Sequence, residues 1–231
     1  MDHLYDTHFH LDLQKDRNAA IYEIEEKQIY TIAVTNLPDL YRKESAEIAS
    51  KYIRFGLGFH PELVHEYQKQ IPLMWELLPE VRYIGEVGLD FTDKTFQLEQ
   101  VAFFSALIER CRYDKRKVIS IHSRRAVSDV LDIIGSNYRF KPILHWFTGT
   151  KEELLNAIEK GFYFSVNSAM MTSKRFLNLL PLIPKDRFLL ETDSPFISKT
   201  SHSDVLAETA RKIGQYKEGL DVWNNFKMLL A

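Results

Sequence analysis

Short apolar segments rich in β-branched and aromatic residues recur along the chain, and stretches with helical spacing separate them. The segments predict strands near residues 4–10, 29–35, 53–58, 82–87, 117–122, 141–146, 161–166 and 187–191. The clearest helix is predicted over 96–112, where apolar residues follow one another at helical steps: Val101, Phe104, Ile108 and Cys111. Further helices are predicted over 124–135 and near 201–213, with Ser203 as the cap of the second.

Strands that alternate with helices are typical of a parallel sheet built from βαβ units. Eight such units in 231 residues fit an α/β fold of one kind, a single (β/α)₈ barrel of the TIM type. No segment rich in Pro, Gly or Ser has the composition of a linker. Residues 1–231 are therefore predicted to form one domain.

Composition and charge narrow the class of protein. The chain is 45% hydrophobic and 27% charged, as globular proteins are, and its formal charge of -2 provides no global basic surface. A nucleic-acid partner would have to be bound by local positive charge or by bound metal. Cys111 is the only cysteine, which excludes an intramolecular disulfide and a thiolate zinc site. No stretch approaches the roughly 18 apolar residues of a membrane span, so we expect a cytoplasmic protein without membrane contact.

The segment "DTHFHLD" near the start of the chain has an unusual pattern of polar residues. In a strand alternate side chains share a face, so Asp6, His8, His10 and Asp12 are expected to project to one side. A core strand has little use for such groups, because buried polar groups cost free energy unless they are paired. The motif indicates either a metal site or a surface loop rich in His and Asp.

Polar residues also collect at the carboxyl ends of the other predicted strands. The full set is His8, His10, His60, Glu86, Asp90, His122, Arg124, His145, Glu191 and Asp193. In a barrel these ends meet at one rim, where the loops form the active site. Imidazole and carboxylate without thiolate suit a divalent cation such as Mg, Mn or Zn, and the set exceeds one tetrahedral site. Each residue alone also has a structural interpretation, such as a hydrogen-bonded His60 or a solvated Arg124.

Seven segments in order along the chain resemble the TatD-like metal-dependent hydrolases, a nuclease branch of the amidohydrolase superfamily. They are "DTHFHLD", "GFHPE", "IGEVGLD", "FQLEQVAFFSAL", "VISIHSRRA", "LHWFTGT" and "LLETDSPF". The ordered set covers roughly residues 4–197 and is specific, whereas two histidines one residue apart are a weak signal alone. The resemblance implies a TIM barrel and a DNase, often a 3′–5′ exonuclease that prefers single-stranded ends.

The resemblance also implies two divalent metal ions that share one carboxylate. The first ion would be held by His8, His10, Glu86 and Asp193. Glu86 would bridge to a second ion, completed by His122 and His145. The chain departs from the family pattern in three places: Glu62 in place of a histidine, Trp146 in place of a small residue, and no Arg-Asn-Glu-Pro loop after "ETDSPF". The segment after "ETDSPF" is expected to form part of the rim, so this last departure concerns substrate choice.

The expected reaction is phosphodiester hydrolysis of DNA by two metal ions. Catalytic roles are expected for Glu86, for Asp193 as ligand and acceptor of the proton of water, and for Glu191, which would position water or tune Asp193. His60, Asp90 and Arg124 are expected to contact phosphate or sugar. Trp146 and Phe147 are candidates for stacking on an unpaired base or for packing under the rim.

Two alternatives stay open at this point. The same metal pair can activate water against another ester or an amide bond, such as the ester of an aminoacyl-tRNA. The barrel could instead be a scaffold subunit of a complex, or an enzyme active only with a partner protein. Short divergent relatives also resemble nuclease components of bacterial anti-phage operons, which implies a defence role and protein partners from the same operon.

Overall fold

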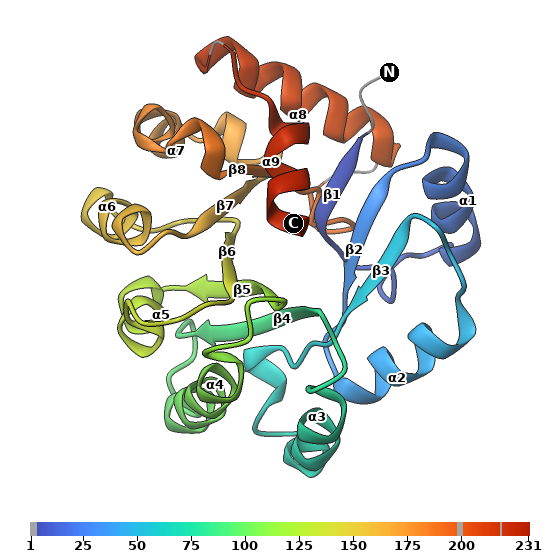
Figure 1. The fold of residues 1–231 in the computed structure, drawn as a ribbon, viewed down its shortest axis with the longest axis vertical. Helices are drawn as coiled ribbons and strands as arrows, with labels where there is room; N and C mark the ends of the chain where they lie inside the picture. Colours follow the sequence, from blue (N-terminus) through green and yellow to red (C-terminus); the bar gives the residue numbers. More distant parts are fainter. Residues whose placement is uncertain (1–3, 198–200, 218) are drawn as a thin grey trace.

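A ring of parallel strands stands inside a ring of helices in the computed structural model, which describes residues 4–197, 201–217 and 219–231 (Figure 1). The strands are β1 (Tyr5–Phe9), β2 (Tyr30–Val34), β3 (Ile53–Gly56), β4 (Tyr83–Asp90), β5 (Val118–Arg124), β6 (Lys141–His145), β7 (Tyr163–Val166) and β8 (Phe188–Leu190). Each of them overlaps one predicted strand, and the predicted (β/α)₈ barrel is confirmed.

Helices follow the strands, and all but the last of those described cover the outside of the barrel (Figure 1). They are α1 (Arg17–Lys27), α2 (Pro38–Glu47), α3 (Ile71–Leu77), α4 (Gln97–Cys111), α5 (Val127–Ile134), α6 (Lys151–Glu159), α7 (Lys174–Leu179), α8 (His202–Tyr216) and α9 (Val222–Leu230). Within the described ranges, every helix is too short or too polar to cross a membrane.

The predicted cap of α8 is wrong. Ser201 caps this helix, because its side chain accepts a hydrogen bond from the amide of Asp204 at 3.2 Å. Ser203 is engaged elsewhere: its backbone N and its Oγ both donate to Glu23 Oε1 on α1, at 2.9 and 3.0 Å. Ser203 therefore docks α8 against α1 instead of capping it.

Two hydrogen-bonded sheets, β1-β2-β3 and β4-β5-β6-β7-β8, close on each other to form the barrel. At one seam the amide of Leu57 donates to the carbonyl of Tyr83 at 3.0 Å, just beyond β3. At the other seam the amide of Asp193 donates to the carbonyl of His8 at 3.0 Å. Closure brings the carboxyl ends of all these strands to one rim.

Two strands run further than predicted. Parallel pairing of β4 with β5 continues to their last residues, where Asp90 lies opposite Arg124. Asp90 is therefore the final residue of β4, and His122 lies inside β5 instead of ending it. In contrast, β1 and β8 end one residue before His10 and Glu191.

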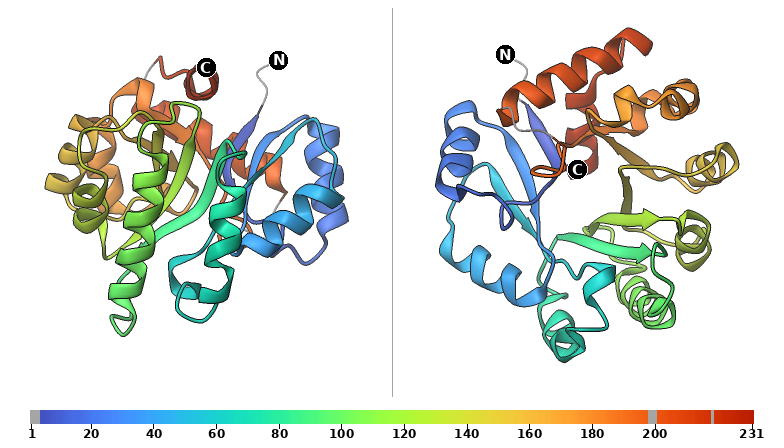
Figure 2. Two further views of the ribbon diagram at one scale, coloured as in Figure 1. Left: turned by 60° about the horizontal axis from the view of Figure 1, so that its bottom comes forward. Right: turned by 180° about the vertical axis from the view of Figure 1, so that it is seen from behind.

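Helix α9 lies across the amino-terminal end of the barrel, opposite the rim that carries the polar residues (Figures 1 and 2). Phe226 of α9 stacks on Tyr5 at the start of β1, with ring centroids 4.3 Å apart. Lys141, the first residue of β6, donates from Nζ to the carbonyl of Leu229 at 2.7 Å. These contacts cover the amino-terminal end of the barrel, and the predicted site residues lie at the opposite end.

Candidate metal centre

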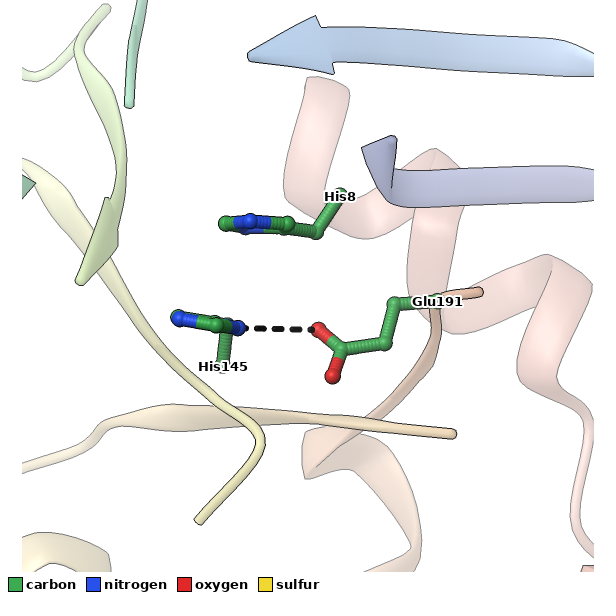
Figure 3. A group of neighbouring side chains, drawn as sticks. All are labelled: His8, His145 and Glu191. Carbon is green, nitrogen blue, oxygen red and sulfur yellow. Dashed lines mark ion pairs between the residues drawn. The ribbon is translucent and has the colours of Figure 1, made fainter. Parts of the chain in front are cut away.

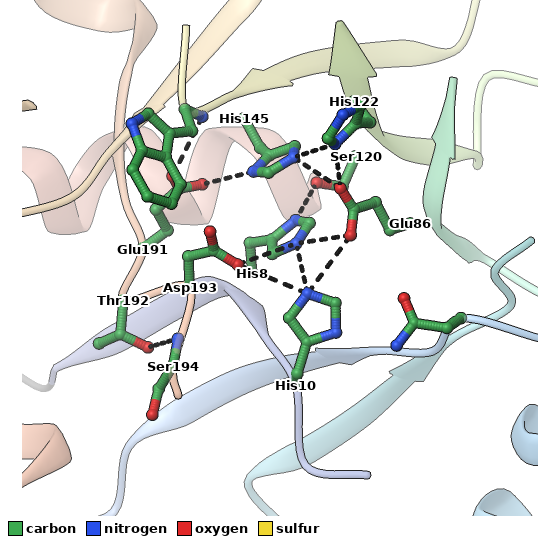
Figure 4. A network of polar contacts seen from close by, with 12 residues as sticks. His8, His10, Glu86, Ser120, His122, His145, Glu191, Thr192, Asp193 and Ser194 are labelled. Carbon is green, nitrogen blue, oxygen red and sulfur yellow. Dashed lines mark hydrogen bonds and ion pairs between the residues drawn. The ribbon is translucent and has the colours of Figure 1, made fainter. Parts of the chain in front are cut away.

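A pocket of about 840 Å³ opens at the rim where the carboxyl ends of the strands meet. The predicted metal ligands that line it are His10, Glu86, His122, His145 and Asp193. His8 lies beneath them with no exposed surface, and its ring faces the same cluster (Figure 4). The closed barrel thus brings together all the predicted ligands, although they are distant along the sequence.

Glu86 lies at the centre of the cluster, and its Oε2 faces the two histidines of the first motif (Figure 4). Oε2 is 3.3 Å from His10 Nε2 and 3.6 Å from His8 Nε2. Asp193 Oδ1 lies 3.4 Å from His10 Nε2 and 3.7 Å from His8 Nε2. Donor atoms that share a cation at about 2.1 Å are separated by about 3–3.5 Å, so this spacing suits a common metal ion.

The other oxygen of Glu86 faces a second group of imidazoles. Oε1 lies 2.6 Å from His122 Nδ1 and 2.8 Å from His145 Nε2, and these two nitrogens are 3.4 Å apart. His60 Nε2 is 3.7 Å from the same oxygen, so this predicted substrate contact also borders the second group. One carboxylate therefore stands between two sets of ligand atoms.

Asp90 holds the ring of His122 in place. Its Oδ2 lies 2.8 Å from His122 Nε2, and its Oδ1 accepts from the amide of Thr92 at 2.8 Å. With Nε2 engaged in this way, Nδ1 of His122 points at Glu86. Asp90 is 2% exposed, whereas Arg124, at the end of β5, is exposed on the pocket wall.

Sequence reasoning missed Ser120, which orients His8. Its Oγ lies 2.7 Å from His8 Nδ1, so that Nε2 of His8 faces Glu86 and Asp193. Ser120 stands two residues before His122 in β5 and shares its side of the strand. The two-residue spacing from His122 could have identified Ser120 from the sequence. A polar partner on the other ring nitrogen is common for a metal-binding histidine.

Charge is unevenly distributed over the imidazoles. Burial opposes protonation of His10, but its hydrogen bonds with Asp193 and Glu86 outweigh burial and raise its pKa to about 10. For His122 the negative charge of Glu86 and the hydrogen bond with Asp90 likewise overcome burial and raise the pKa to about 9. Burial lowers the pKa of His8 and of His60 to about 4. The cluster therefore attracts positive charge at two positions, one on each side of Glu86.

The donor set fits divalent metal ions. His8, His10 and Asp193 form one group with ligand atoms within 4.8 Å of one another, and His60, Glu86 and His122 form another. All donors are nitrogen or oxygen, which suits Mg, Mn or Zn. The buried Nδ1 atoms of His10 and His145 have no hydrogen-bond partner in the described part of the chain, although each lies within 4 Å of a carboxylate, that of Asp12 and that of Glu191.

Glu191 lies behind the cluster, fully buried. The rings of His8 and His145 stack at 3.9 Å, and His145 Nδ1 is 3.9 Å from Glu191 Oε2 (Figure 3). Glu191 Oε1 accepts from the amide of Trp146 at 3.1 Å and from Asn167 Nδ2 at 2.8 Å, while Oε2 accepts from Ser165 Oγ. Burial and the charge of Asp193 raise the pKa of this carboxyl well above its usual value.

The expectation that Asp6, His8, His10 and Asp12 project together is wrong for Asp6. The pairing of β1 with β2 shifts register between Asp6 and Phe9, which breaks the simple alternation. Asp6 Oδ2 accepts from Thr192 Oγ1 at 2.6 Å and lies 2.8 Å from His202 Nε2, away from the imidazole cluster. Asp12 lies beside the cluster, with Oδ1 3.8 Å from His10 Nδ1.

Left-handed backbone conformations gather at the rim. Arg125, Trp146 and Asp193 have φ values of 56°, 41° and 50°, and all three line the pocket. Residues other than glycine rarely adopt such angles, and they do so most often at functional sites. Phe147 is buried and packs edge-on against Phe164, so Trp146 is the member of that aromatic pair at the pocket.

Fold and site together define a metal-dependent hydrolase built on a (β/α)₈ barrel. The chain belongs to the TatD related DNase family, whose family model matches residues 5–221. The resemblance inferred from the seven sequence segments is thereby confirmed.

Two relatives and one solved structure illustrate what the chain is similar to. A protein of Erwinia billingiae named 3′-5′ ssDNA/RNA exonuclease TatD is 29% identical over 195 residues, which are 79% of this chain and 74% of that protein. The metal-dependent hydrolase YabD of Bacillus subtilis, described as uncharacterized, is 27% identical over 93% of this chain and 91% of its own length. The crystal structure of the TatD homolog YJJV of Escherichia coli K12 is similar in fold, with a TM-score of 0.83, 17% identity and coverage of 99% and 98% of the two chains.

Proposed function

We propose that the protein is a two-metal DNase that shortens single-stranded DNA from its 3′ end, with Mg, Mn or Zn as the metal. The position of Glu86 carries the proposal: one carboxylate oxygen faces His8 and His10, and the other faces His122 and His145. A carboxylate between two nitrogen-rich ligand sets is an arrangement that would hold two metal ions side by side, as two-metal hydrolysis requires. The name of the Erwinia billingiae relative supports the substrate class.

The ligand roles follow the two faces of Glu86. His8, His10 and Asp193 would hold the first ion and His122 and His145 the second, with Glu86 shared between them. When bound, such ions lower the pKa of water and stabilise charge on the scissile phosphate. Asp193 stands on the pocket floor and would accept the proton of the attacking water.

The remaining predicted residues have distinct roles in this proposal. Arg124 is exposed on the pocket wall, where its guanidinium would bind the phosphate. His60 stays neutral at pH 7 because burial lowers its pKa, and it would donate a hydrogen bond to substrate at the edge of the second ligand group. Asp90 would act through His122, and Glu191 through Trp146 and His145, so both are positioning residues.

Purified protein with Mn²⁺ and 5′-labelled or 3′-labelled single-stranded oligonucleotides tests the proposal. We expect the 5′ label to give a ladder of shorter products and the 3′ label to appear at once as a mononucleotide. His122→Ala and Asp193→Asn should lower the rate by about 1,000-fold or more, because the first removes a proposed ligand and the second removes the charge and the proton acceptor of another. His65→Ala and Asp132→Asn are matched controls, since both residues are exposed and lie outside the pocket lining.

Equal rates for the wild type and both ligand variants would contradict the proposal. Hydrolysis of RNA, of an aminoacyl-tRNA ester or of an amide in place of DNA would keep the metal centre and change the substrate. Activity that appears only with an added partner protein would favour the subunit alternative. One-domain organisation of residues 1–231, a cytoplasmic location, an anti-phage role and operon partners stay predictions from the sequence.

A further inference from the structure

Arginines occupy one side of the pocket only. Arg124 and Arg125 lie at the end of β5, and Arg175 lies in α7, which follows β7. Leu13, Leu63 and Phe196, from the segments after β1, β3 and β8, line the remaining wall together with Asn36 and Glu62. The pocket thus has a cationic side, from β5 to α7, and a mainly apolar side that also carries the carboxylate of Glu62 and on which no arginine or lysine is among the described lining residues.

The side chains of Arg124 and Arg125 are exposed and have no hydrogen bond or ion pair within the described part of the chain. Elsewhere, Arg17 pairs with Glu44 and Arg116 with Asp114, each at 2.8 Å. Solvent-facing guanidinium groups beside a pocket, without a carboxylate partner, are available to bind an anion.

Arg175 is held in place without being neutralised. Its Nη2 donates to the carbonyl of Gly149 at 2.8 Å, which leaves its other N–H groups available. Arg175 also borders a smaller apolar cavity of about 170 Å³ that shares Trp146 and Thr148 with the main pocket. Strand β5 ends at Arg124, and the left-handed backbone of Arg125 turns the chain there. Both arginines therefore line the same wall of the pocket.

We infer that Arg125 and Arg175 form an extended phosphate-binding wall for the part of the DNA strand beyond the scissile bond. The inference rests on the proposed function, which places the scissile phosphate over Glu86 and Arg124. Because the positive charge lies only on the β5 to α7 side, the next phosphates leave the metal centre in that direction. Substrate recognition then depends on strand length: a single diester reaches the metal centre, whereas a longer strand also contacts the wall.

Chain-length dependence tests the wall. We compare kcat/KM for hexathymidylate with kcat/KM for thymidine 5′-(p-nitrophenyl phosphate), which has a single diester. In the R125Q/R175Q double variant the ratio of the two values should fall about 100-fold, because each charge-assisted contact with a phosphate contributes about a factor of ten. K174Q/R211Q is the matched control, since it removes the same charge from exposed positions outside the pocket and should keep the wild-type ratio.

Binding without metal provides a readout independent of hydrolysis. Anisotropy of fluorescein-labelled hexathymidylate in EDTA, at 50–200 mM salt, gives the slope of log K against log salt. Loss of two phosphate contacts should make that negative slope shallower by about 1.4 for a single strand in R125Q/R175Q, and leave it unchanged in K174Q/R211Q.

The outcomes separate the inference from the proposed function. If the two double variants have the same kcat/KM ratio and the same salt slope, the phosphate-binding wall is contradicted, even if the protein is an active DNase. Loss of affinity in R125Q/R175Q alone would support the wall even if the wild type hydrolysed neither substrate, and in that case only the proposed function would fail.

Discussion

Comparing Glu191→Ala with Glu191→Gln shows whether Glu191 supports the structure of the site or takes part in the reaction. Three donors converge on its carboxylate: the amide of Trp146, Asn167 Nδ2 and Ser165 Oγ. Glu191→Ala leaves these buried donors without an acceptor, at about 1–3 kcal/mol each, so we expect a loss of about 3–9 kcal/mol in the free energy of unfolding. Glu191→Gln keeps one oxygen for Trp146 and Asn167, and Ser165 can reverse its hydrogen bond to accept from the amide.

Because the pKa of Glu191 is raised, the glutamine side chain of Glu191→Gln resembles the native, neutral carboxyl. Burial and the charge of Asp193 favour the neutral carboxyl, so Glu191→Gln should change the free energy of unfolding by no more than about 1 kcal/mol. We expect Glu191→Gln to keep its manganese and a kcat within about tenfold of the wild type. Glu191→Ala should lose metal, because the amide of Trp146 that Glu191 holds directly follows the proposed ligand His145.

Urea unfolding, manganese content and kcat on a labelled oligonucleotide measure the three effects. Asp193→Asn is the reference for loss of a chemical group, since it should lower kcat far more than it lowers stability. A Glu191→Gln protein that is stable and metal-loaded but as inactive as Asp193→Asn would refute the positioning role. Wild-type stability of Glu191→Ala would refute the hydrogen-bond account.

Two further predictions concern stability. Burial raises the pKa of Glu44 to about 7 from its usual 4.5, although Arg17 opposes the shift. The folded state therefore binds this proton more tightly, and stability from this group falls as pH rises from about 4.5 to 7. Relative to wild type, Glu44→Gln should gain up to about 3 kcal/mol over that range in urea unfolding, and a constant difference would contradict the assignment. A Cβ at Gly88, where φ is 140°, would lie 2.1 Å from the carbonyl oxygen of His122. Gly88→Ala should therefore lose more than about 4 kcal/mol and its metal, whereas Gly214→Ala, with open space around it in α8, should be neutral or stabilising. A stable, metal-loaded Gly88→Ala would contradict this.

The barrel could be predicted because each strand has a local signal. Apolar segments with β-branched residues mark β2, β5 and β6, and the alternation with helical stretches leaves few other topologies. Strand ends were less predictable, because they depend on partners. β4 continues to Asp90 since it pairs with β5 and since the amide of Asp90 donates to Gln100 Oε1 at 2.8 Å.

The gathering of these histidines and carboxylates at one rim could be predicted, because such residues at strand ends are rare without a function. The spacing of these residues did not predict which of them lie on each side of Glu86. That grouping was predicted from the family resemblance. Asp6 shows where alternation fails: a register shift in β1 turns it toward Thr192 and His202. The position of Arg175 could not be predicted, because it lies in α7 and reaches the pocket only through the fold of the segment after β7.

Diffraction from crystals grown with Mn²⁺, collected at the manganese absorption edge, tests the central claim most directly. We expect two anomalous peaks, one on each side of the Glu86 carboxylate. The first should contact His8, His10 and Asp193, and the second His122 and His145. A single peak away from Glu86, or no peak among these six side chains, would contradict the two-metal centre.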